Sequence, residues 1–81
     1  MNYNVTLQSG KKVQREMADA ITARNQAEDM ARRNDAWKGS SWRSGKDRFH
    51  IGPDGRIPSS EWPNGRVEVT QYDVDRAVDG L

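Results

Sequence analysis

Apolar residues recur every three or four positions along residues 19–35, the spacing that places side chains on one side of an α-helix. The positions concerned are Ala20, Ala23, Ala27, Met30 and Ala31. Because alanine side chains are small, this side of the helix can approach a sheet closely. We expect Asp19 or Thr22 to be the N-cap, since either side chain can accept a free N–H of the first turn. The other side of the helix is expected to face water and carries Arg24, Gln26, Glu28, Arg32 and Arg33.

Two stretches before the helix alternate between apolar and polar residues, as half-buried strands do. Residues 2–7 place an apolar side chain at every second position. Residues 11–17 can run back as a second strand after a short turn, with Val13 and Met17 facing inward and Arg15 between them. The chain therefore begins with a predicted β-hairpin that leads into the helix.

The second half of the chain contains several turn signals and short alternating runs. Residues 36–47 are rich in glycine and serine and are predicted as a loop. Residues 48–51 alternate again, and the Gly-Pro-Asp-Gly turn after them predicts a hairpin with a return strand at 56–57. A Pro-Asn-Gly turn then leads to a predicted strand at 66–69, and a short helix is expected over 71–79.

These elements predict an α+β fold. We expect a small, mostly antiparallel sheet of four to five short strands, with one long helix packed on one face and a short C-terminal helix. The 81 residues suffice for a single domain, 1–81. Because large apolar side chains are few, they can fill one layer between the helix and the sheet but not a second core. The other face of the sheet is therefore expected to stay uncovered.

The composition excludes several classes of protein. The chain has no cysteine, which removes disulfides, thiolate catalysis and cysteine-ligated zinc, and which suits a reducing compartment. It has no signal-peptide pattern at its start and no apolar run near the length of about 18 residues that a membrane helix needs. We therefore expect a soluble protein of the cytoplasm with no membrane partner.

Residues that could support catalysis or metal binding lack the necessary setting. His50 is the only histidine and has no nucleophile motif around it. Asp73, Asp75 and Asp79 do not have the spacing of an EF-hand loop. The glycine-containing stretches near Gly45 lack the phosphate-binding spacing of a P-loop. We predict no catalytic residue, no metal site and no cofactor, and a protein that is not an enzyme.

Basic and acidic residues are unevenly distributed along the chain, although the net charge is only +1. Residues 32–56 contain seven basic and three acidic side chains, whereas residues 57–81 contain two basic and five acidic ones. Such an asymmetry can give the surface a basic pole that meets an anionic partner. The alternative is that the two segments neutralise each other in the folded protein, and the sequence leaves both interpretations open.

Aromatic and basic residues are interleaved in the predicted loop and the strand after it. Trp37, Trp42 and Phe49 could stack on nucleic-acid bases or form hot spots of a protein interface, and they could equally belong to the core. We expect Phe49 in the core and consider Trp42, in its glycine-rich surroundings, the best candidate for exposure. The predicted partner-binding residues are Arg32, Arg33, Trp37, Lys38, Trp42, Arg43, Lys46 and Arg48.

The predicted architecture resembles that of small phage-encoded inhibitors of host defence, the anti-CRISPR proteins. The resemblance lies in the short strand at 3–7, the helix with Ala23, Ala27 and Ala31 inward, and the further strands closed by tight turns. It covers most of the chain, but no residue motif defines that group, so no functional residue is carried over. The resemblance implies a stoichiometric inhibitor without enzyme activity, which covers a functional surface of a host nucleoprotein complex in the host cytoplasm.

The function predicted from the sequence is therefore binding. The first choice is a phage-type inhibitor that contacts a host protein or nucleoprotein complex through the basic aromatic loop. The second is a nucleic-acid-binding protein that uses the same loop, although a net charge of +1 is low for that class. The third is a virion or assembly component. The sequence leaves the oligomeric state open between monomer and homodimer.

Overall fold

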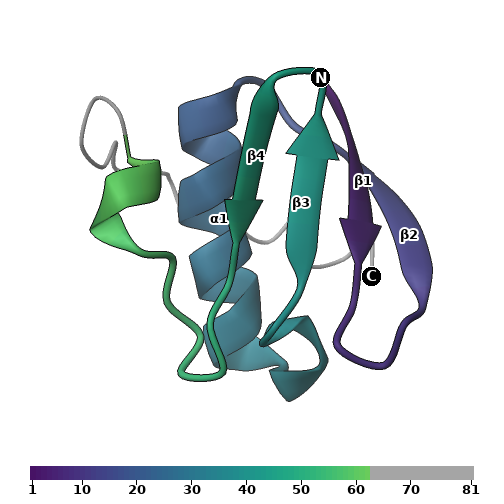
Figure 1. The fold of residues 1–81 in the computed structure, drawn as a ribbon, viewed down its shortest axis with the longest axis vertical. Helices are drawn as coiled ribbons and strands as arrows, with labels where there is room; N and C mark the ends of the chain where they lie inside the picture. The colour runs from purple at the N-terminus through teal and green to yellow at the C-terminus, as the bar shows by residue number, and fades with distance from the viewer. Residues whose placement is uncertain (63–81) are drawn as a thin grey trace.

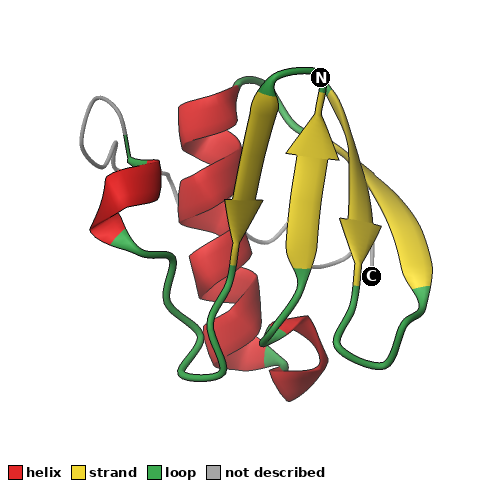
Figure 2. Ribbon diagram, viewed as in Figure 1, coloured by secondary structure: helices red, strands yellow, loops and turns green. Residues whose placement is uncertain are grey.

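Four short strands form one antiparallel sheet, and the helix α1 lies across one of its faces (Figures 1 and 2). The structure is a computed structural model and describes residues 1–62. The order of strands in the sheet is β2-β1-β3-β4. The elements are β1 (Asn2–Thr6), β2 (Lys12–Glu16), α1 (Ala20–Arg33), the 3-10 turn η1 (Asp35–Trp37), β3 (Ser41–Ser44), β4 (Asp47–His50) and the 3-10 turn η2 (Ser59–Glu61). This arrangement confirms the predicted α+β class.

The first two strands form the predicted hairpin. Val5 of β1 lies opposite Val13 of β2, so the apolar positions of both strands share one face. The turn between them is closed by a hydrogen bond from the Leu7 N–H to the Lys11 carbonyl at 2.8 Å. Gly10 adopts a φ of 90° in this turn, a left-handed conformation that favours glycine. Alternation of side chains and a turn with glycine were therefore sufficient to locate this hairpin.

The third strand corrects the predicted loop at 36–47. Residues 41–44 form β3, which pairs with β1 on one side and with β4 on the other. The turn from β3 to β4 contains only Gly45 and Lys46, and the φ of 58° at Gly45 with no positive φ at Lys46 fits a type II′ turn. The loop prediction was wrong because β3 has a single large apolar residue, Trp42, which is enough when both neighbouring strands pair with it.

The segment after β4 was predicted correctly as a turn and incorrectly as a hairpin. The Gly52 N–H donates to the Arg56 carbonyl at 2.8 Å, which closes the turn. β4 pairs with β3, and the chain after the turn crosses to α1, where the Ile57 N–H donates to Oε2 of Glu28 at 2.8 Å. The strand predicted at 66–69 and the helix predicted at 71–79 lie outside the described residues.

The apolar side of α1 packs on the sheet as predicted. Asp19 is the N-cap, and its carboxylate accepts the Thr22 N–H at 2.7 Å. Ala23, Ala27 and Ala31 are fully buried against the sheet. The core that they join contains Tyr3, Val5, Met17, Met30, Trp37, Trp42, Phe49, Ile51 and Ile57. In the described part of the chain, no helix is long and apolar enough to span a membrane.

The polar side of α1 differs from the prediction. Arg32 and Arg33 are exposed as expected, but Arg24, Gln26 and Glu28 are buried. Glu28 is buried because the segment after β4 runs along this side of the helix and Ile57 donates to its carboxylate. The guanidinium of Arg24 lies 5.7 Å from the ring centroid of Phe49. Sequence periodicity could not reveal this burial, because it depends on the path of a distant segment.

Candidate functional site

The two tryptophans of the predicted contact surface belong to the core. Trp42 has an exposed fraction of 0% and Trp37 of 3%, so the expectation that Trp42 is exposed was wrong. The Trp42 ring stacks on Phe49 with centroids 5.3 Å apart, and its Nε1–H donates to Oγ of buried Ser40 at 2.9 Å. The rings of Trp37 and Trp42 are 5.6 Å apart. These rings fill the space between sheet and helix and cannot stack on a ligand.

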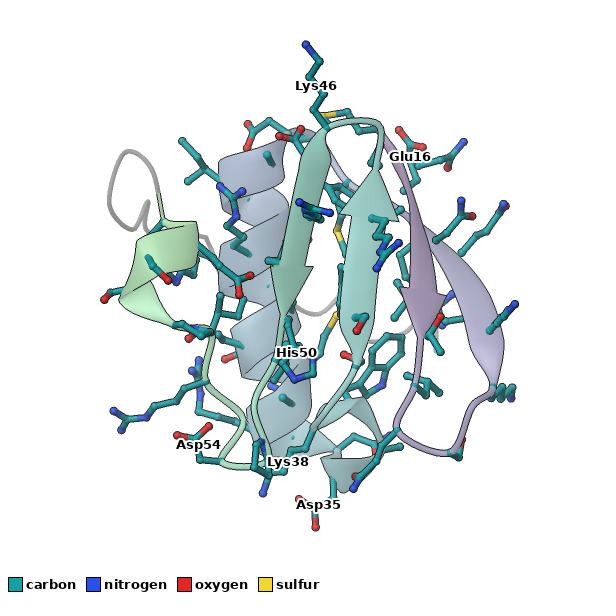
Figure 3. The ribbon with its side chains drawn as sticks, in the orientation of Figure 1. Glu16, Asp35, Lys38, Lys46, His50 and Asp54 are labelled. Atoms are coloured by element: carbon teal, nitrogen blue, oxygen red, sulfur yellow. The ribbon has the colours of Figure 1, made fainter. Side chains whose placement is uncertain are left out.

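Three of the predicted basic residues lie near the C-terminal end of α1 and have acidic neighbours. Asp29 accepts a hydrogen bond from Arg32 at 2.6 Å and forms an ion pair with Arg33, whose Nε lies 3.0 Å from its carboxylate. The Lys38 Nζ lies 2.9 Å from the Asp35 carboxylate. Figure 3 places Lys38 and Asp35 near one end of the molecule and Lys46 at the other. The charges at this end of the helix are therefore locally neutralised. The other predicted basic residues lie at a distance from it.

Arg43 and Arg48 are brought together by the β3–β4 pairing. They lie directly opposite each other in the register, and both are exposed. Their strand neighbours Trp42 and Phe49 point into the core, so the two arginines project from the opposite face of the sheet. Figure 1 views this face, and no described helix or strand covers it. The sequence had predicted one uncovered face of the sheet.

We call this surface the open face. It consists of the outward side chains of the four strands, which the register aligns in rows. One row is Gln14, Asn4, Arg43 and Arg48, and the next is Lys12, Thr6, Ser41 and His50. A third, shorter row is Asn2 and Glu16, and the Glu16 carboxylate pairs with the N-terminal ammonium at 2.6 Å. The side chains of the open face are all polar, in contrast to the apolar residues on the inner face of the same strands. The sheet thus separates a core surface from a surface made for polar contacts.

The open face is hollowed by two shallow depressions. The larger, of about 860 Å³, is lined by Asn4, Val5, Thr6, Lys12, Val13, Gln14, Ser41 and Arg43. The smaller, of about 330 Å³, is lined by Ser41, Trp42, Arg43, Arg48, Phe49, His50 and Glu61. Ser41 and Arg43 line both, so the two depressions are neighbours across the sheet. An extended ligand lying across the four strands would contact both.

The positive charges of the open face lack counterions within the described residues. Lys12, Arg43 and Arg48, together with Lys46 of the adjoining turn, form no ion pair with residues 1–62. The larger depression has no acidic lining residue. In the smaller depression Glu61 is present, and its Oε2 accepts the backbone N–H of His50 at 2.8 Å. The open face therefore presents a positive potential to an approaching molecule.

Ser41 and His50 form a pair on this face that superficially resembles a catalytic dyad. Ser41 Oγ and His50 Nδ1 are 3.4 Å apart. A serine nucleophile also needs a carboxylate that orients the imidazole and a strained setting for the serine. Here Glu61 contacts the histidine backbone, and Ser41 lies in a regular strand. The pair can offer a hydroxyl and an imidazole as hydrogen-bonding groups.

The buried polar groups near the core do not form a second site. The hydroxyl of Tyr3 is buried and has no hydrogen-bond partner among residues 1–62, and burial, with a contribution from Asp47, raises the pKa of Tyr3 to about 12. The phenol is therefore neutral at ordinary pH. Among residues 1–62 no group of three histidine, cysteine or carboxylate side chains could hold a metal ion.

Comparison with models of protein families, with curated proteins and with solved structures gave no match. Function is therefore argued from the open face. Of the residues predicted to bind a partner, Arg43, Lys46 and Arg48 lie on or beside the open face, and that prediction did not include Lys12 and His50, which lie on it too. The signal that could have identified Lys12 and His50 is the set of polar residues in each alternating strand, because these residues share the outward face of the sheet.

Proposed function

We propose that this protein is a non-enzymatic binding protein and that the open face of the sheet is its contact surface. The observation that carries the proposal is the positive charge of Lys12, Arg43, Lys46 and Arg48, which residues 1–62 leave unpaired, on and beside a polar sheet face that no described element covers. Charges of one sign on an open surface favour association with a partner of the opposite sign. The partner is therefore anionic at the point of contact.

The biological setting that we propose is inhibition of a host nucleoprotein complex by a phage-type protein of the anti-CRISPR kind. This setting rests on the resemblance of architecture. A small domain with one free face can act stoichiometrically by covering a functional surface, which requires no chemistry of its own. A nucleoprotein complex offers anionic surface in its nucleic acid, which matches the charge of the open face.

A second candidate is a protein that binds nucleic acid without a protein partner. The juxtaposition of Arg43 and Arg48 favours it, because guanidinium groups bind phosphate oxygens in a bidentate manner. The charge of the whole chain does not decide between the candidates, since the net charge of +1 sums acidic and basic regions. The local charge of the open face is what a ligand would meet.

The proposal is tested by capture from a host-cell lysate with tagged protein, before and after nuclease treatment. The informative variant is Arg43→Gln/Arg48→Gln. The matched control is Arg32→Gln/Arg33→Gln, which removes two exposed arginines near the end of α1. We expect the wild type and the control to capture the same complex and the open-face variant to lose it. Equal capture by both double variants would contradict the assignment of the contact surface.

The nuclease treatment separates the two candidates. A partner that stays bound after nuclease is held by protein contacts, as an inhibitor of a nucleoprotein complex would be. A partner that is released by nuclease was held through nucleic acid. Capture of nothing by the wild type, with or without nuclease, would contradict both.

A further inference from the structure

From the geometry of the open face we infer that its ligand is the phosphate backbone of a nucleic-acid double helix, with Arg43 and Arg48 closing on one phosphate from two adjacent strands. This inference rests on the proposed function, because it takes the open face as the contact surface and adds the chemistry of what is bound. The ligand that we infer is nucleic acid, and an acidic protein surface is the alternative that the experiment tests.

Arg43 and Arg48 are paired across β3 and β4, close to the turn that joins the two strands. In a hairpin with a two-residue turn, the pair next to the turn exchanges hydrogen bonds and the following pair does not. Ser44 and Asp47 are the first pair, so Arg43 and Arg48 are the second. Side chains of such non-hydrogen-bonded pairs lie closest together. Two arginine side chains thus leave the sheet at closely spaced positions on the open face.

Two like charges directly opposite each other destabilise a strand pair. Arg43 and Arg48 have no carboxylate partner within residues 1–62 that would relieve this repulsion. An anion bound between the two arginines would relieve the repulsion. A phosphate group is suited to that position, because its oxygens can accept two parallel hydrogen bonds from each planar guanidinium. The pair therefore has the properties of a phosphate clamp that is unfavourable when empty.

The other two cations, Lys46 and Lys12, lie in or beside the two hairpin turns. Lys46 lies in the β3–β4 turn, and Lys12 begins β2 beside the β1–β2 turn. Because β1 and β3 are antiparallel, these two turns are at opposite ends of the sheet. The positive charges therefore run diagonally over the sheet, from Lys46 at the end labelled in Figure 3, past the arginine pair, to Lys12. A line of charge fits a linear polyanion better than it fits one small anion.

Neutral polar residues occupy the open face between these charges. Asn4, Thr6, Gln14 and Ser41 lie between Lys12 and the arginine pair in the first two rows. The amide and hydroxyl groups of these residues can donate to phosphate and sugar oxygens. The Gln14 amide already donates to Asn4 Oδ1 at 3.1 Å, which links the two side chains on the surface. The diagonal line of charge is thus flanked by hydrogen-bond donors.

The residue composition of the open face favours nucleic acid over a protein partner. Interfaces between proteins obtain much of their affinity from buried tryptophan, tyrosine and similar anchors. Among the described residues, Met1 is the only large hydrophobic residue that is exposed. A polar and positively charged surface without apolar anchors is typical of contacts with nucleic acid.

The burial of the large aromatic residues favours a duplex over a single strand as the ligand. Proteins that bind single strands stack the bases on aromatic side chains. The large aromatic residues of β3 and β4, Trp42 and Phe49, are buried on the inner face, so the imidazole of His50 is the one aromatic ring that these two strands offer on the open face. A double helix keeps its bases stacked internally and presents phosphates outward. Recognition by backbone contacts alone is independent of base sequence.

The experiment measures binding of the full-length protein to a short labelled DNA or RNA duplex, the matching single strand, and polyglutamate as an acidic peptide. Affinity is determined between about 50 and 200 mM salt by fluorescence anisotropy. We expect the duplex to bind most tightly, with a slope of log K against log salt of about −2 to −3, the value for roughly three neutralised phosphates, one at the arginine pair and one at each lysine. Duplexes of different sequence should bind equally.

Variants locate the binding on the open face. The double variant Arg43→Gln/Arg48→Gln should make the slope shallower by about 1, because the two arginines share one phosphate, and Arg32→Gln should leave it unchanged. Arg43→Lys should keep the slope and weaken binding, because it keeps the charge and loses the bidentate geometry. Without ligand, Arg48→Gln should melt at or above the temperature of the wild type. A lower melting temperature would show that the arginine has a structural role and would contradict the clamp.

The outcomes separate this inference from the proposed function. Tighter binding to polyglutamate than to either nucleic acid, with the same dependence on Arg43 and Arg48, would overturn the inference and leave the open face as a contact surface. Tighter binding to the single strand would overturn the choice of a duplex. Equal loss of binding in Arg32→Gln and Arg48→Gln would contradict the proposed contact surface itself.

Discussion

Trp42 lies directly opposite Phe49 across β3 and β4, and their rings stack with centroids 5.3 Å apart and planes 21° apart. The next pair along the same strands, Arg43 and Arg48, faces the other way. One short hairpin therefore supplies both a part of the core and the centre of the proposed contact surface. The division between stability and binding in this hairpin leads to predictions that can be measured separately.

Trp42→Ala should strongly destabilise the protein. The side chain is fully buried and packs against Phe49, Tyr3 and Trp37. Replacing a buried tryptophan by alanine costs about 3–5 kcal/mol, a large part of the stability of a small domain. The loss can be measured by urea unfolding followed by far-UV circular dichroism. A free energy of unfolding equal to that of the wild type would mean that Trp42 is not in the core.

Tyr3→Phe should leave the fold intact and stabilise it by about 1 kcal/mol, because it removes a buried hydroxyl that has no hydrogen-bond partner in the described part of the chain. Tyr3→Leu is the matched control, since it also removes the hydroxyl but loses the ring contacts with Trp42 and Phe49. The control should be less stable than the wild type. Thermal unfolding of the three proteins at neutral pH gives the comparison, and a destabilised Tyr3→Phe would indicate an unrecognised partner for the hydroxyl.

The same residue predicts a pH dependence at the alkaline end. An unfolded tyrosine ionises near pH 10, whereas burial raises the pKa of Tyr3 in the folded protein to about 12. The unfolded state therefore loses its proton first, and the wild type should lose stability as the pH rises between these values. The difference in stability between wild type and Tyr3→Phe should change across this window. A constant difference would show that Tyr3 ionises equally in both states.

Asp19→Ala should shorten or weaken α1. The Asp19 carboxylate caps the helix by accepting the Thr22 N–H, and this hydrogen bond lowers its pKa. Loss of such a cap costs about 1 kcal/mol. Because the pKa is lower in the folded state, the stabilisation is complete above the unfolded value of about 4 and is lost as the pH falls through the folded value. Urea unfolding at neutral and acidic pH should therefore show a difference between the two proteins that disappears in acid.

Arg48→Glu should stabilise the free protein because it replaces the repulsion from Arg43 by an attraction. Cross-strand charge pairs change stability by about 0.2–1 kcal/mol. The gain should be seen in thermal unfolding at low salt and should shrink at high salt, where exposed charges are screened. Arg32→Glu is the control, since it breaks the ion pair with Asp29 and should be destabilising. A lower melting temperature for Arg48→Glu than for the wild type would contradict the unrelieved repulsion.

The elements that the sequence predicted correctly are those whose signal is local. Tyr3 and Val5 alternate with polar residues, and Ala23 and Ala27 recur at helical spacing, so each pattern identified its own buried side. β3 was missed because its only large apolar residue is Trp42. The symmetry of Trp42 and Phe49 about Gly45 and Lys46 was a signal that a search for hairpins would have found.

The parts that the sequence could not predict depend on the order of strands and on distant segments. Arg43 and Arg48 were predicted as partner-binding residues and lie on the open face, but Lys12 joins that face only because β1 lies between β2 and β3. Similarly, Glu28 has the pattern of a water-facing residue and is buried by Ile57, which is distant in the sequence. Local periodicity contains no information on either arrangement.

The most direct test of the open face as the contact surface is a nuclear magnetic resonance titration of isotope-labelled protein with a short nucleic-acid duplex. Backbone and guanidinium signals report where the ligand binds, residue by residue, in the intact protein. We predict shifts at Arg43, Arg48 and the β2 residue Lys12, with little change at Arg32 and Arg33. Shifts confined to the end of α1 and to η1, or no shifts at any residue, would contradict the account.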